Sequence, residues 1–386
     1  MKNNKGITLV ALVVTIVVLL ILAGVSINLV LGNNGIIAKA KEAETKSAEA
    51  SQNDLKGMNG LVSEMEGALA GNGSTGSGSG NGNTGSGNNF VTKNTEVTYP
   101  DGKVWIPEGF KVADDSASTV QGGVVIEDKD RNQFVWVPVA TLADYKRTAY
   151  STNVATEETD TATNSIKINY SSSKNSEYFT EALPEDEKTS VERYKGFYIG
   201  RYEAGDKENT EAKTLRSSND VTKTVTIKAN QAPYNNVTKT QAISLAEGFA
   251  TKQGYKAKTK LVSSYAWDTT IEFIQKVNSD YGSSSEEGNY YNTTFSYTDI
   301  TGARQTKAKN SNVLVPTGQT TPVCNIYDMG GNVFEWTTES CSNTVNPYAK
   351  RGGFYYYIFA NLPAGFRDDG SDDADDGDGF RLTLFM

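Results

Sequence analysis

The sequence predicts an α+β protein in which a long N-terminal helix and a flexible linker precede one globular domain. Short apolar runs with a two-residue period, bounded by Gly, Pro, Asp or Asn, are typical of strands and occur throughout residues 100–202. Longer segments at 241–253 and 267–277 repeat apolar residues every three or four positions, as helices do. Strands combined with a few helices in one domain favour the α+β class.

The chain starts with a short basic leader, residues 1–6 (MKNNKG), followed by an apolar run without charge over residues 7–25. At about 1.5 Å per residue, a helix of this length crosses a hydrocarbon core, so we expect membrane insertion through residues 7–30. One alternative is a cleaved secretory signal, although Leu22-Ala23-Gly24-Val25 matches the small-residue cleavage site poorly. A simple single-span anchor is the other alternative.

Residues Lys5-Gly6-Ile7-Thr8-Leu9-Val10 resemble the prepilin processing signature of type IV pilins and pseudopilins. The resemblance implies that prepilin peptidase cuts between Gly6 and Ile7, that the apolar helix stays on the mature protein, and that pilus subunits are partners. The family usually carries Glu at the fifth mature position, which is Ala11 here. This replacement removes a carboxylate that sets subunit register but keeps the apolar packing, so it argues against a major-subunit role.

The next segments complete the domain organisation. After a break at Gly32–Gly35, Ala, Lys and Glu at close spacing favour helix to residue 70. Residues 71–89 contain no apolar side chain and therefore predict a flexible Gly/Ser/Asn linker with a span of about 25 Å. We thus expect a leader at 1–6, a pilin-like hydrophobic and amphipathic helix at 7–70, a linker at 71–89 and a globular domain at 90–386.

Composition excludes several classes of function. The formal net charge is −9 and the pI about 4.9, so no basic surface is expected to neutralise phosphates, and we expect no nucleic-acid partner. The chain has no His, which excludes a Ser-His-Asp triad, a Cys-His dyad and an imidazole metal site. Cys324 and Cys341 are compatible with either a disulfide or two free thiols.

Within the domain, we expect strands at 104–107, 134–139 and 196–203. The segments 143–188 and 281–312 are polar and rich in Ser, Thr and Asn, which predicts surface insertions.

The motifs FVWVPV (134–139), GFYIGRYEAG (196–205), NIYDMGGNVFEWT (325–337), RGG (351–353) and GFR (379–381) occur in the order found in the formylglycine-generating-enzyme family. This resemblance implies a C-type-lectin-like fold for residues 90–386. Asn332 and Glu335 correspond to positions that bind calcium in some relatives, which makes them candidate calcium ligands; no other cofactor is expected. The alternative is that both side chains form structural hydrogen bonds within the turn.

The segment between RGG and GFR has an unusual composition. Its acids are all Asp, and it contains no Glu, Lys, Gln, Met or Trp. The residues present are reachable from an Asn codon by changes at its two adenines, whereas the missing ones are not. This pattern resembles the variable region of a diversity-generating retroelement target, which implies a hypervariable ligand-binding surface. The alternative is a solvated acidic loop that follows an aromatic turn. The candidate ligand-binding residues are Phe354, Tyr355, Tyr356, Tyr357, Ile358, Phe359, Asn361, Asp368, Asp369, Ser371, Asp372, Asp373, Asp375, Asp376 and Asp378.

Together these patterns predict a bacterial, pilin-anchored, hypervariable binding protein for adhesion or partner capture rather than an enzyme. It would be inserted in the cytoplasmic membrane and then displayed on the cell surface or a pilus, where it binds a protein or glycan on a cell or phage surface. Family members that oxidise cysteine use two cysteines between the RGG and GFR motifs, and this segment has none. The alternative is an extracytoplasmic, membrane-anchored enzyme of the formylglycine-generating type. The run DDADDG (372–377) does not support an EF-hand, because Ala374 takes a ligand position.

Overall fold

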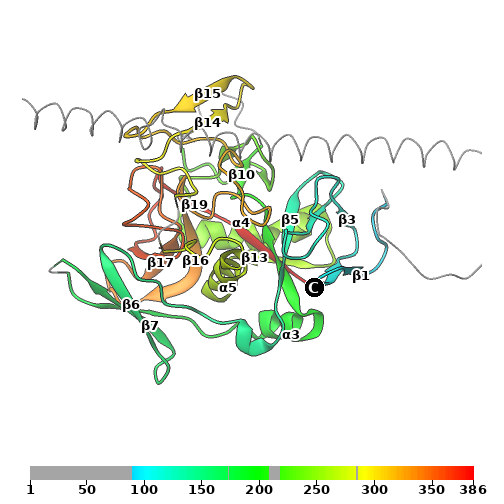
Figure 1. Cartoon of the computed structure of the whole chain (residues 1–386), viewed down its shortest axis with the longest axis horizontal. Coiled ribbons are helices and arrows are strands. Elements are labelled where there is room, and N and C mark those ends of the chain that lie inside the picture. Colours follow the sequence, from blue (N-terminus) through cyan, green and yellow to red (C-terminus); the bar gives the residue numbers. More distant parts are fainter. Residues whose placement is uncertain (1–88, 173, 208–217, 284–285) are drawn as a thin grey trace, which may run out of the picture. The chain divides into compact units, whose positions relative to one another are not determined.

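The computed structural model describes residues 89–386 except 173, 208–217 and 284–285 (Figure 1). The described residues all belong to one compact unit, Asn83–Met386. The leader, the helix expected at 7–70 and all but the last residue of the linker lie outside the described residues. In the part of the chain that the structure does describe, no helix has the length and apolar character needed to span a membrane.

The domain is a mixed α+β structure, as the sequence predicts, and its central sheet has the strand order β13-β20-β9-β5-β4-β3. The strands of this sheet are β3 (Lys111–Val112), β4 (Val125–Glu127), β5 (Gln133–Pro138), β9 (Gly196–Gly200), β13 (Lys258–Leu261) and β20 (Leu382–Phe385). Strands predicted at 134–139 and 196–203 are confirmed as β5 and β9, although β9 ends at Gly200. Every residue of β9 is buried because the strand lies between β5 and β20.

A second large sheet has the order β18-β17-β16-β8-β7-β6, with β19 parallel to β16. Its strands are β6 (Ala155–Asp160), β7 (Ser165–Tyr170), β8 (Glu177–Thr180), β16 (Phe334–Cys341), β17 (Tyr348–Arg351), β18 (Arg367–Gly370) and β19 (Asp378–Phe380). The segment between RGG and GFR therefore leaves this sheet at the end of β17, returns as β18 and enters β19.

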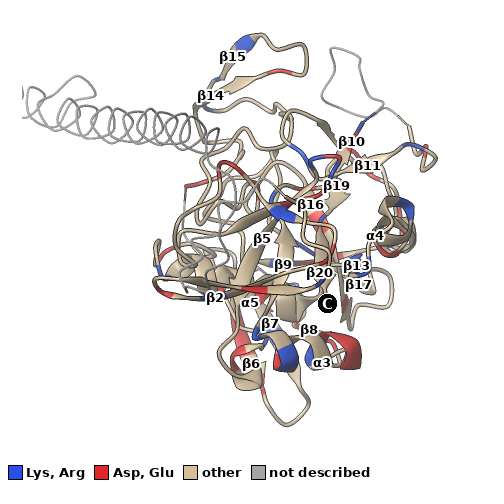
Figure 2. Cartoon of the chain, turned by 90° about the vertical axis from the view of Figure 1, so that its right-hand side faces the viewer, with Lys and Arg blue, Asp and Glu red and all other residues tan. Residues whose placement is uncertain are grey.

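The helices are α3 (Glu185–Tyr194), α4 (Lys239–Gln253) and α5 (Ser264–Gln275), with a short 3₁₀ helix at Leu142–Asp144. The predicted helices at 241–253 and 267–277 are confirmed as α4 and α5, which begin earlier because Thr238 and Ser263 cap them. The acidic first turn of α3, red in Figure 2, interacts favourably with the helix dipole. Helix α5 packs against both β5 and β16, and so joins the two large sheets.

Smaller sheets complete the domain. They comprise the hairpin β1 (Thr95–Tyr99) and β2 (Gly102–Ile106), the strands β10 (Gly205–Asp206), β11 (Val225–Thr226) and β12 (Ala232–Pro233), and the hairpin β14 (Phe295–Thr298) and β15 (Arg304–Lys307). The strand predicted at 104–107 lies in β2. Hairpins β14–β15 and β6–β7 stand at opposite ends of the domain in Figure 1.

The expected polar insertion at 143–188 is more than a surface segment. It supplies β6, β7 and β8 to the second sheet, and Ile166, Ile168 and Phe179 are buried in a core cluster with Phe334 and Phe366. The expectation of a plain surface insertion is therefore wrong here, because alternate residues of β6 and β8 face inward, and these buried residues include both apolar side chains and the paired carboxylates Glu157 and Glu177.

The core lies on both faces of the central sheet. Along β5, Phe134 and Trp136 pack into one apolar cluster, whereas Val135 and Val137 pack into the other. This two-residue alternation follows from strand geometry, in which successive side chains point to opposite faces. The cluster containing Phe334 lies beneath residues 354–378, which we call the variable segment after the sequence prediction, and half-buried Phe354 packs against it.

Candidate functional site

The entry to the variable segment depends on two glycines with left-handed backbone. Gly352 has φ +91° and Gly353 has φ +68°, and a Cβ on Gly353 would lie 2.1 Å from the carbonyl oxygen of Leu362. The Gly352 carbonyl accepts hydrogen bonds from the Tyr290 hydroxyl at 2.9 Å and the Gly331 amide at 2.8 Å. The RGG motif therefore fixes a tight turn that other residues would strain.

The backbone after this turn is held by residues outside the segment. The hydrogen bonds run from the Tyr355 amide to Asn332 O (3.1 Å), from the Tyr291 amide to Tyr357 O (2.9 Å), from the Phe359 amide to Asn292 Oδ1 (3.2 Å) and from the Asn153 amide to Ala360 O (3.2 Å). In three of these four contacts both partners are backbone groups, and the fourth uses a side chain that lies outside the segment. These contacts therefore fix the backbone of residues 355–360 without using the side chains of those residues.

The aromatic side chains at the start of the segment differ in burial: Phe354 packs on the core, whereas Tyr356 and Tyr357 are exposed. Phe354 is half-buried and packs on Phe334, with ring centroids 4.9 Å apart. Tyr356 and Tyr357 are 57% and 46% exposed and surround Phe354. Burial, together with the nearby Asp376 carboxylate, raises the pKa of Tyr355 to about 12, which keeps its hydroxyl protonated as a donor.

The second half of the segment, residues 371–377, lies beside these rings. A Cβ on Gly377 would come within 2.8 Å of the Phe354 ring, and the Tyr355 hydroxyl is 3.5 Å from Asp376 Oδ2. The backbone here is also held from outside, since the Asn236 amide donates to Asp375 O at 2.9 Å and Asn235 Nδ2 donates to Asp376 O at 2.6 Å. The aromatic and acidic halves thus form one continuous surface.

The aspartates of the segment have different environments. Asp372, Asp373, Asp375 and Asp376 are exposed, and Ser371 donates to Asp373 at 2.6 Å. Asp372 accepts hydrogen bonds from the amide (3.0 Å) and the hydroxyl (2.6 Å) of Thr240, in the first turn of α4. These four residues supply the exposed negative charge of the surface.

Asp368, Asp369 and Asp378 lie on β18 and β19 rather than in an exposed loop. Lys174 Nζ is 2.7 Å from Asp369 Oδ1, and Lys350 Nζ is 3.1 Å from Asp378 Oδ1. Lysines that are distant in sequence therefore pair with Asp369 and Asp378. Burial raises the pKa of both Asp368 and Asp378 to about 6.

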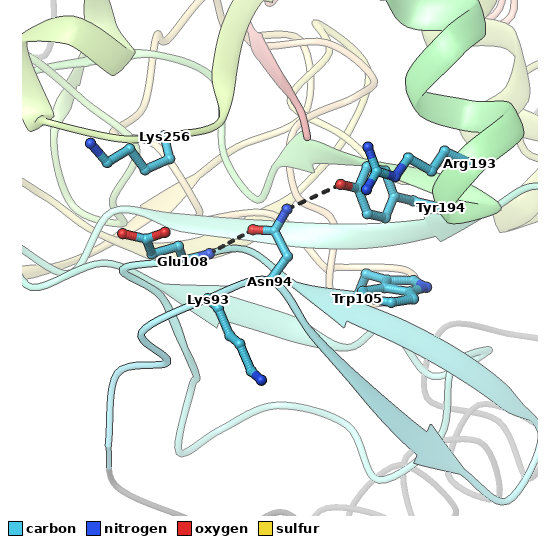
Figure 3. Close-up of a pocket in the computed structure, with 7 residues that line it drawn as sticks. All are labelled: Lys93, Asn94, Trp105, Glu108, Arg193, Tyr194 and Lys256. Carbon is cyan, nitrogen blue, oxygen red and sulfur yellow. Dashed lines mark hydrogen bonds between the residues drawn. The ribbon is translucent and has the colours of Figure 1, made fainter.

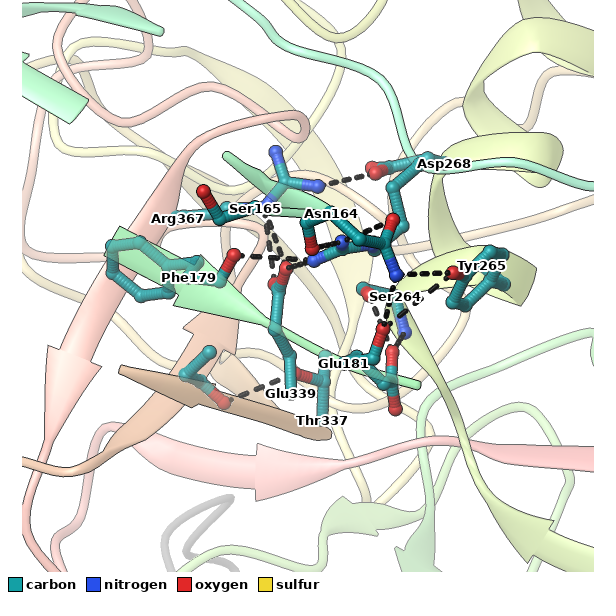
Figure 4. Close-up of polar contacts among 12 residues, drawn as sticks. Asn164, Ser165, Phe179, Glu181, Ser264, Tyr265, Asp268, Thr337, Glu339 and Arg367 are labelled. Atoms are coloured by element: carbon teal, nitrogen blue, oxygen red, sulfur yellow. Dashed lines mark hydrogen bonds and ion pairs between the residues drawn. The ribbon is translucent and has the colours of Figure 1, made fainter. Parts of the chain in front are cut away.

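Arg351, which precedes the segment, and Arg367, which lies within it, are both buried beneath the surface. Arg367 contacts Asp268 and Glu339, with Nε 3.0 Å from Glu339 Oε2 (Figure 4), and it also pairs with Glu157. Arg351 Nη2 lies 2.5 Å from Asp268 Oδ1. This network joins β17 and β18 to α5, β6 and β16. Breaking a buried ion pair would leave an uncompensated charge. The network therefore holds the chain rigidly on both sides of the aromatic residues 354–361.

The candidate calcium residues both form hydrogen bonds within the protein. Asn332 is fully buried, and its Oδ1 accepts from Asn289 Nδ2 at 2.9 Å and from the Val315 amide at 3.1 Å. Both oxygens of Glu335 accept from Arg381, at 2.7 and 2.9 Å. Within the described residues, no cluster of acidic or cysteine side chains has the arrangement of a metal site. Asn332 and Glu335 thus form structural hydrogen bonds, as the alternative to calcium binding predicts.

The two cysteines are free and buried in different apolar clusters. Burial raises the pKa of Cys324 to about 11 and that of Cys341 to about 12, so both are thiols at neutral pH. Of the two arrangements that the sequence allows, the structure has the free thiols.

Sequence patterns did not reveal which residues support the surface, although Asn332 lies in the motif at 325–337 and is considered there as a calcium ligand. Asn332, Tyr291, Lys350 and Glu157 hold the segment or its flanking arginine, yet Tyr291 and Glu157 belong to polar stretches without any motif. The separation of 210 residues between Glu157 and Arg367 leaves no local signal.

No protein family model and no curated protein matches the chain. Solved structures that are similar include the crystal structure of CarF (15% identity, TM-score 0.34, covering 50% of this chain and 87% of that one). PvdO from Pseudomonas aeruginosa is similar at 15% identity and a TM-score of 0.36, covering 68% of this chain and 98% of that one. Treponema denticola variable protein 1 is similar at 13% identity and a TM-score of 0.31, covering 66% of this chain and 96% of that one. Likeness at this level carries over neither a fold nor a function.

Proposed function

We propose that residues 90–386 form a hypervariable ligand-binding module, displayed outside the cell by the N-terminal segment and diversified by a retroelement for adhesion or partner capture. Its contact surface consists of the exposed side chains of residues 354–361 and 371–376. The observation that carries this proposal is the anchoring of the segment's backbone by outside residues. Such anchoring lets side chains change without altering the path of the chain.

The chemistry of the exposed side chains supports a binding role. Tyr356 and Tyr357 offer large amphipathic contact area, and tyrosine loses little conformational entropy when it is immobilised. The neighbouring Asp373, Asp375 and Asp376 add polar contacts and negative charge. A rigid turn that carries aromatic and small polar residues is the arrangement that antibody loops also use.

An enzyme of the formylglycine-generating type has less support. Such an activity requires a reactive thiolate near the substrate, whereas Cys324 and Cys341 are buried thiols with raised pKa. Neither lies in the segment between RGG and GFR.

The binding role is tested with the double variant Tyr356→Ala/Tyr357→Ala. Ligands are first found by screening the protein against glycan and cell-surface protein arrays. We expect the variant to lose at least tenfold in affinity while its melting temperature changes little, because exposed side chains contribute little to stability. Tyr178→Ala is the matched control, since Tyr178 is 41% exposed on β8, and it should keep full affinity. Unchanged binding by the double variant would contradict the assigned surface.

The retroelement part is tested independently by sequencing the coding region from many cells of one culture. We expect substitutions confined to codons between 351 and 381, at positions that are adenine in a nearby near-copy beside a reverse transcriptase gene. A uniform sequence together with the absence of such a copy would remove diversification from the proposal but leave the binding surface testable.

A further inference from the structure

A second site lies away from the variable surface. A hollow of about 400 Å³ opens between the β1–β2 hairpin and the end of α3 (Figure 3). Its lining includes Lys93, Asn94, Trp105, Arg193, Tyr194 and Lys256. In Figure 1, β1 and α3 lie on the opposite side of the domain from β17 and β19, so a ligand here leaves the variable surface free.

The floor of the hollow is fixed by hydrogen bonds. Asn94 Oδ1 accepts from the Glu108 amide at 3.0 Å, and Asn94 Nδ2 donates to the Tyr194 hydroxyl at 3.2 Å. Because the hydroxyl accepts this bond, its own hydrogen is available to donate to a ligand. The rings of Trp105 and Tyr194 pack edge to face, with centroids 5.3 Å apart, which makes the aromatic lining rigid.

The charge of the hollow differs from that of the whole protein. Lys93, Arg193 and Lys256 line it, and among the described residues none of the three forms an ion pair. Arg193 instead stacks over the Tyr194 ring at 5.1 Å. Two negative groups partly offset these cations: the Glu108 carboxylate, and the C-terminus of α3, whose dipole corresponds to about half a negative charge. The hollow therefore keeps an excess of positive charge on a chain of net charge −9.

We propose that this hollow binds a small acidic sugar, meaning a single sugar ring that carries a carboxylate or a phosphate. The volume falls within the range of about 300–1,000 Å³ usual for small-ligand sites. Lys93, Arg193 and Lys256 point in different directions around the hollow (Figure 3), so together they attract the anion and the nearest of them binds it, because guanidinium and ammonium groups form charge-assisted hydrogen bonds with carboxylate and phosphate. Trp105 contacts the apolar face of the ring, and the Tyr194 hydroxyl donates to a ring oxygen.

Tryptophan fluorescence of the full-length protein tests this proposal directly. The chain has four tryptophans, and Trp136, Trp267 and Trp336 are at most 1% exposed, whereas Trp105 is half-buried and lines the hollow. Glucuronate and glucose 6-phosphate serve as probes for the two anions, with glucose and inorganic phosphate as comparisons. We expect saturable changes in emission with at least one acidic sugar, and at least tenfold weaker binding of both comparison compounds.

The charge requirement is tested with Lys93→Gln/Lys256→Gln, for which we expect at least tenfold weaker binding of the acidic sugar. The matched control is Lys252→Gln/Lys309→Gln, which removes two exposed lysines elsewhere and should bind as the natural protein does. The Trp105→Phe variant loses the fluorescence signal of the hollow, so its binding of the acidic sugar is measured by calorimetry instead. Any of three results would overturn the proposal: no response to either acidic sugar, equal binding after the Lys93/Lys256 change, or equal binding of glucose or inorganic phosphate.

Discussion

At the scale of single residues, the aspartates of the variable segment show that one residue type has several roles. Asp378 is 4% exposed and pairs with Lys350, Asp372 binds the first turn of α4, and Asp373 is exposed. In the sequence they are one group, read either as part of a ligand-binding surface or as a solvated acidic loop. The sequence could not separate them, because the partners come from β17 and α4, which are not adjacent to them in the chain.

Asp378 has a testable effect on the pH dependence of stability. Burial raises its pKa in the folded protein to about 6 from a usual value of 3.8, so the folded state binds its proton more tightly than the unfolded state. The stability from this group is fully present below about pH 4 and is lost as the pH rises through 6. Relative to Asp378→Asn, the natural protein should lose up to about 3 kcal/mol of unfolding free energy between pH 4 and 7.

Urea unfolding of both proteins at pH 4, 5, 6 and 7 measures this difference. Asp373→Asn provides the control, because Asp373 is exposed and should track the natural protein at every pH. If the curves of Asp378→Asn and the natural protein run parallel, the carboxylate has no raised pKa in the folded state.

At the scale of elements, the sequence predicts the strands and helices in which apolar residues repeat regularly along the whole element. Strands β5 and β9 and helices α4 and α5 were all identified, with errors only at their ends. Of the elements that were not predicted, β6, β7 and β8 lie in the polar segment 143–188, and β6 (ATEETD) contains a single apolar residue. Glu157 of β6 is buried because Arg367 pairs with it, and pairing of this kind leaves no periodic signal.

The contact between Asp372 and helix α4 predicts a structural role for a candidate ligand residue. Its carboxylate accepts two hydrogen bonds from Thr240 and lies near the positive end of the helix dipole. We expect Asp372→Ala to lower the unfolding free energy by about 0.5–2 kcal/mol, as loss of a helix cap does. Asp373→Ala should change it by less than about 0.5 kcal/mol, as is usual for exposed sites. Denaturant unfolding compares the two, and equal effects would show that the contact contributes nothing to stability.

At the scale of the whole molecule, composition marks the segment that we propose as the binding surface, but it does not predict the shape of that segment. The absence of Glu, Lys, Gln, Met and Trp marks the segment. That residues 354–361 and 371–377 meet on one surface, while β18 between them enters the sheet, depends on contacts with Asn332, Tyr291 and Asn236. Such contacts are distant in sequence, so composition could not predict them.

The proposed display outside the cell would depend on the N-terminal segment, for which we expect the mature chain to begin at Ile7. Lys5-Gly6 precedes the apolar run, and prepilin peptidase cuts after Gly in the family that this signature resembles. Mass spectrometry of the terminal peptide from membrane-extracted protein measures the start. Recovery of Met1, or of a start beyond Val25, would leave the binding domain without a pilin-type anchor.

The exposed acids should steer cationic partners to the variable surface. Asp373, Asp375 and Asp376 are exposed and adjacent, and the domain belongs to a chain of net charge −9, so their field adds to that of the whole molecule. Charges of this kind are screened over about 10 Å at 0.1 M salt. We therefore expect association with a lysine-rich peptide to slow at least tenfold between 20 mM and 500 mM salt, while dissociation, set by the tyrosine contacts, changes less.

Stopped-flow kinetics of Asp373→Asn/Asp375→Asn/Asp376→Asn isolates this local contribution, and Asp372 is kept because it contacts α4. The control Asp114→Asn/Asp130→Asn/Asp280→Asn removes the same charge from exposed positions outside the segment. If the field is local, the first variant associates more slowly at low salt and loses most of its salt dependence, whereas the control keeps both. Equal slowing in both variants would assign steering to net charge alone, and no slowing in either would leave Tyr356, Tyr357 and their aromatic neighbours as the determinants of recognition.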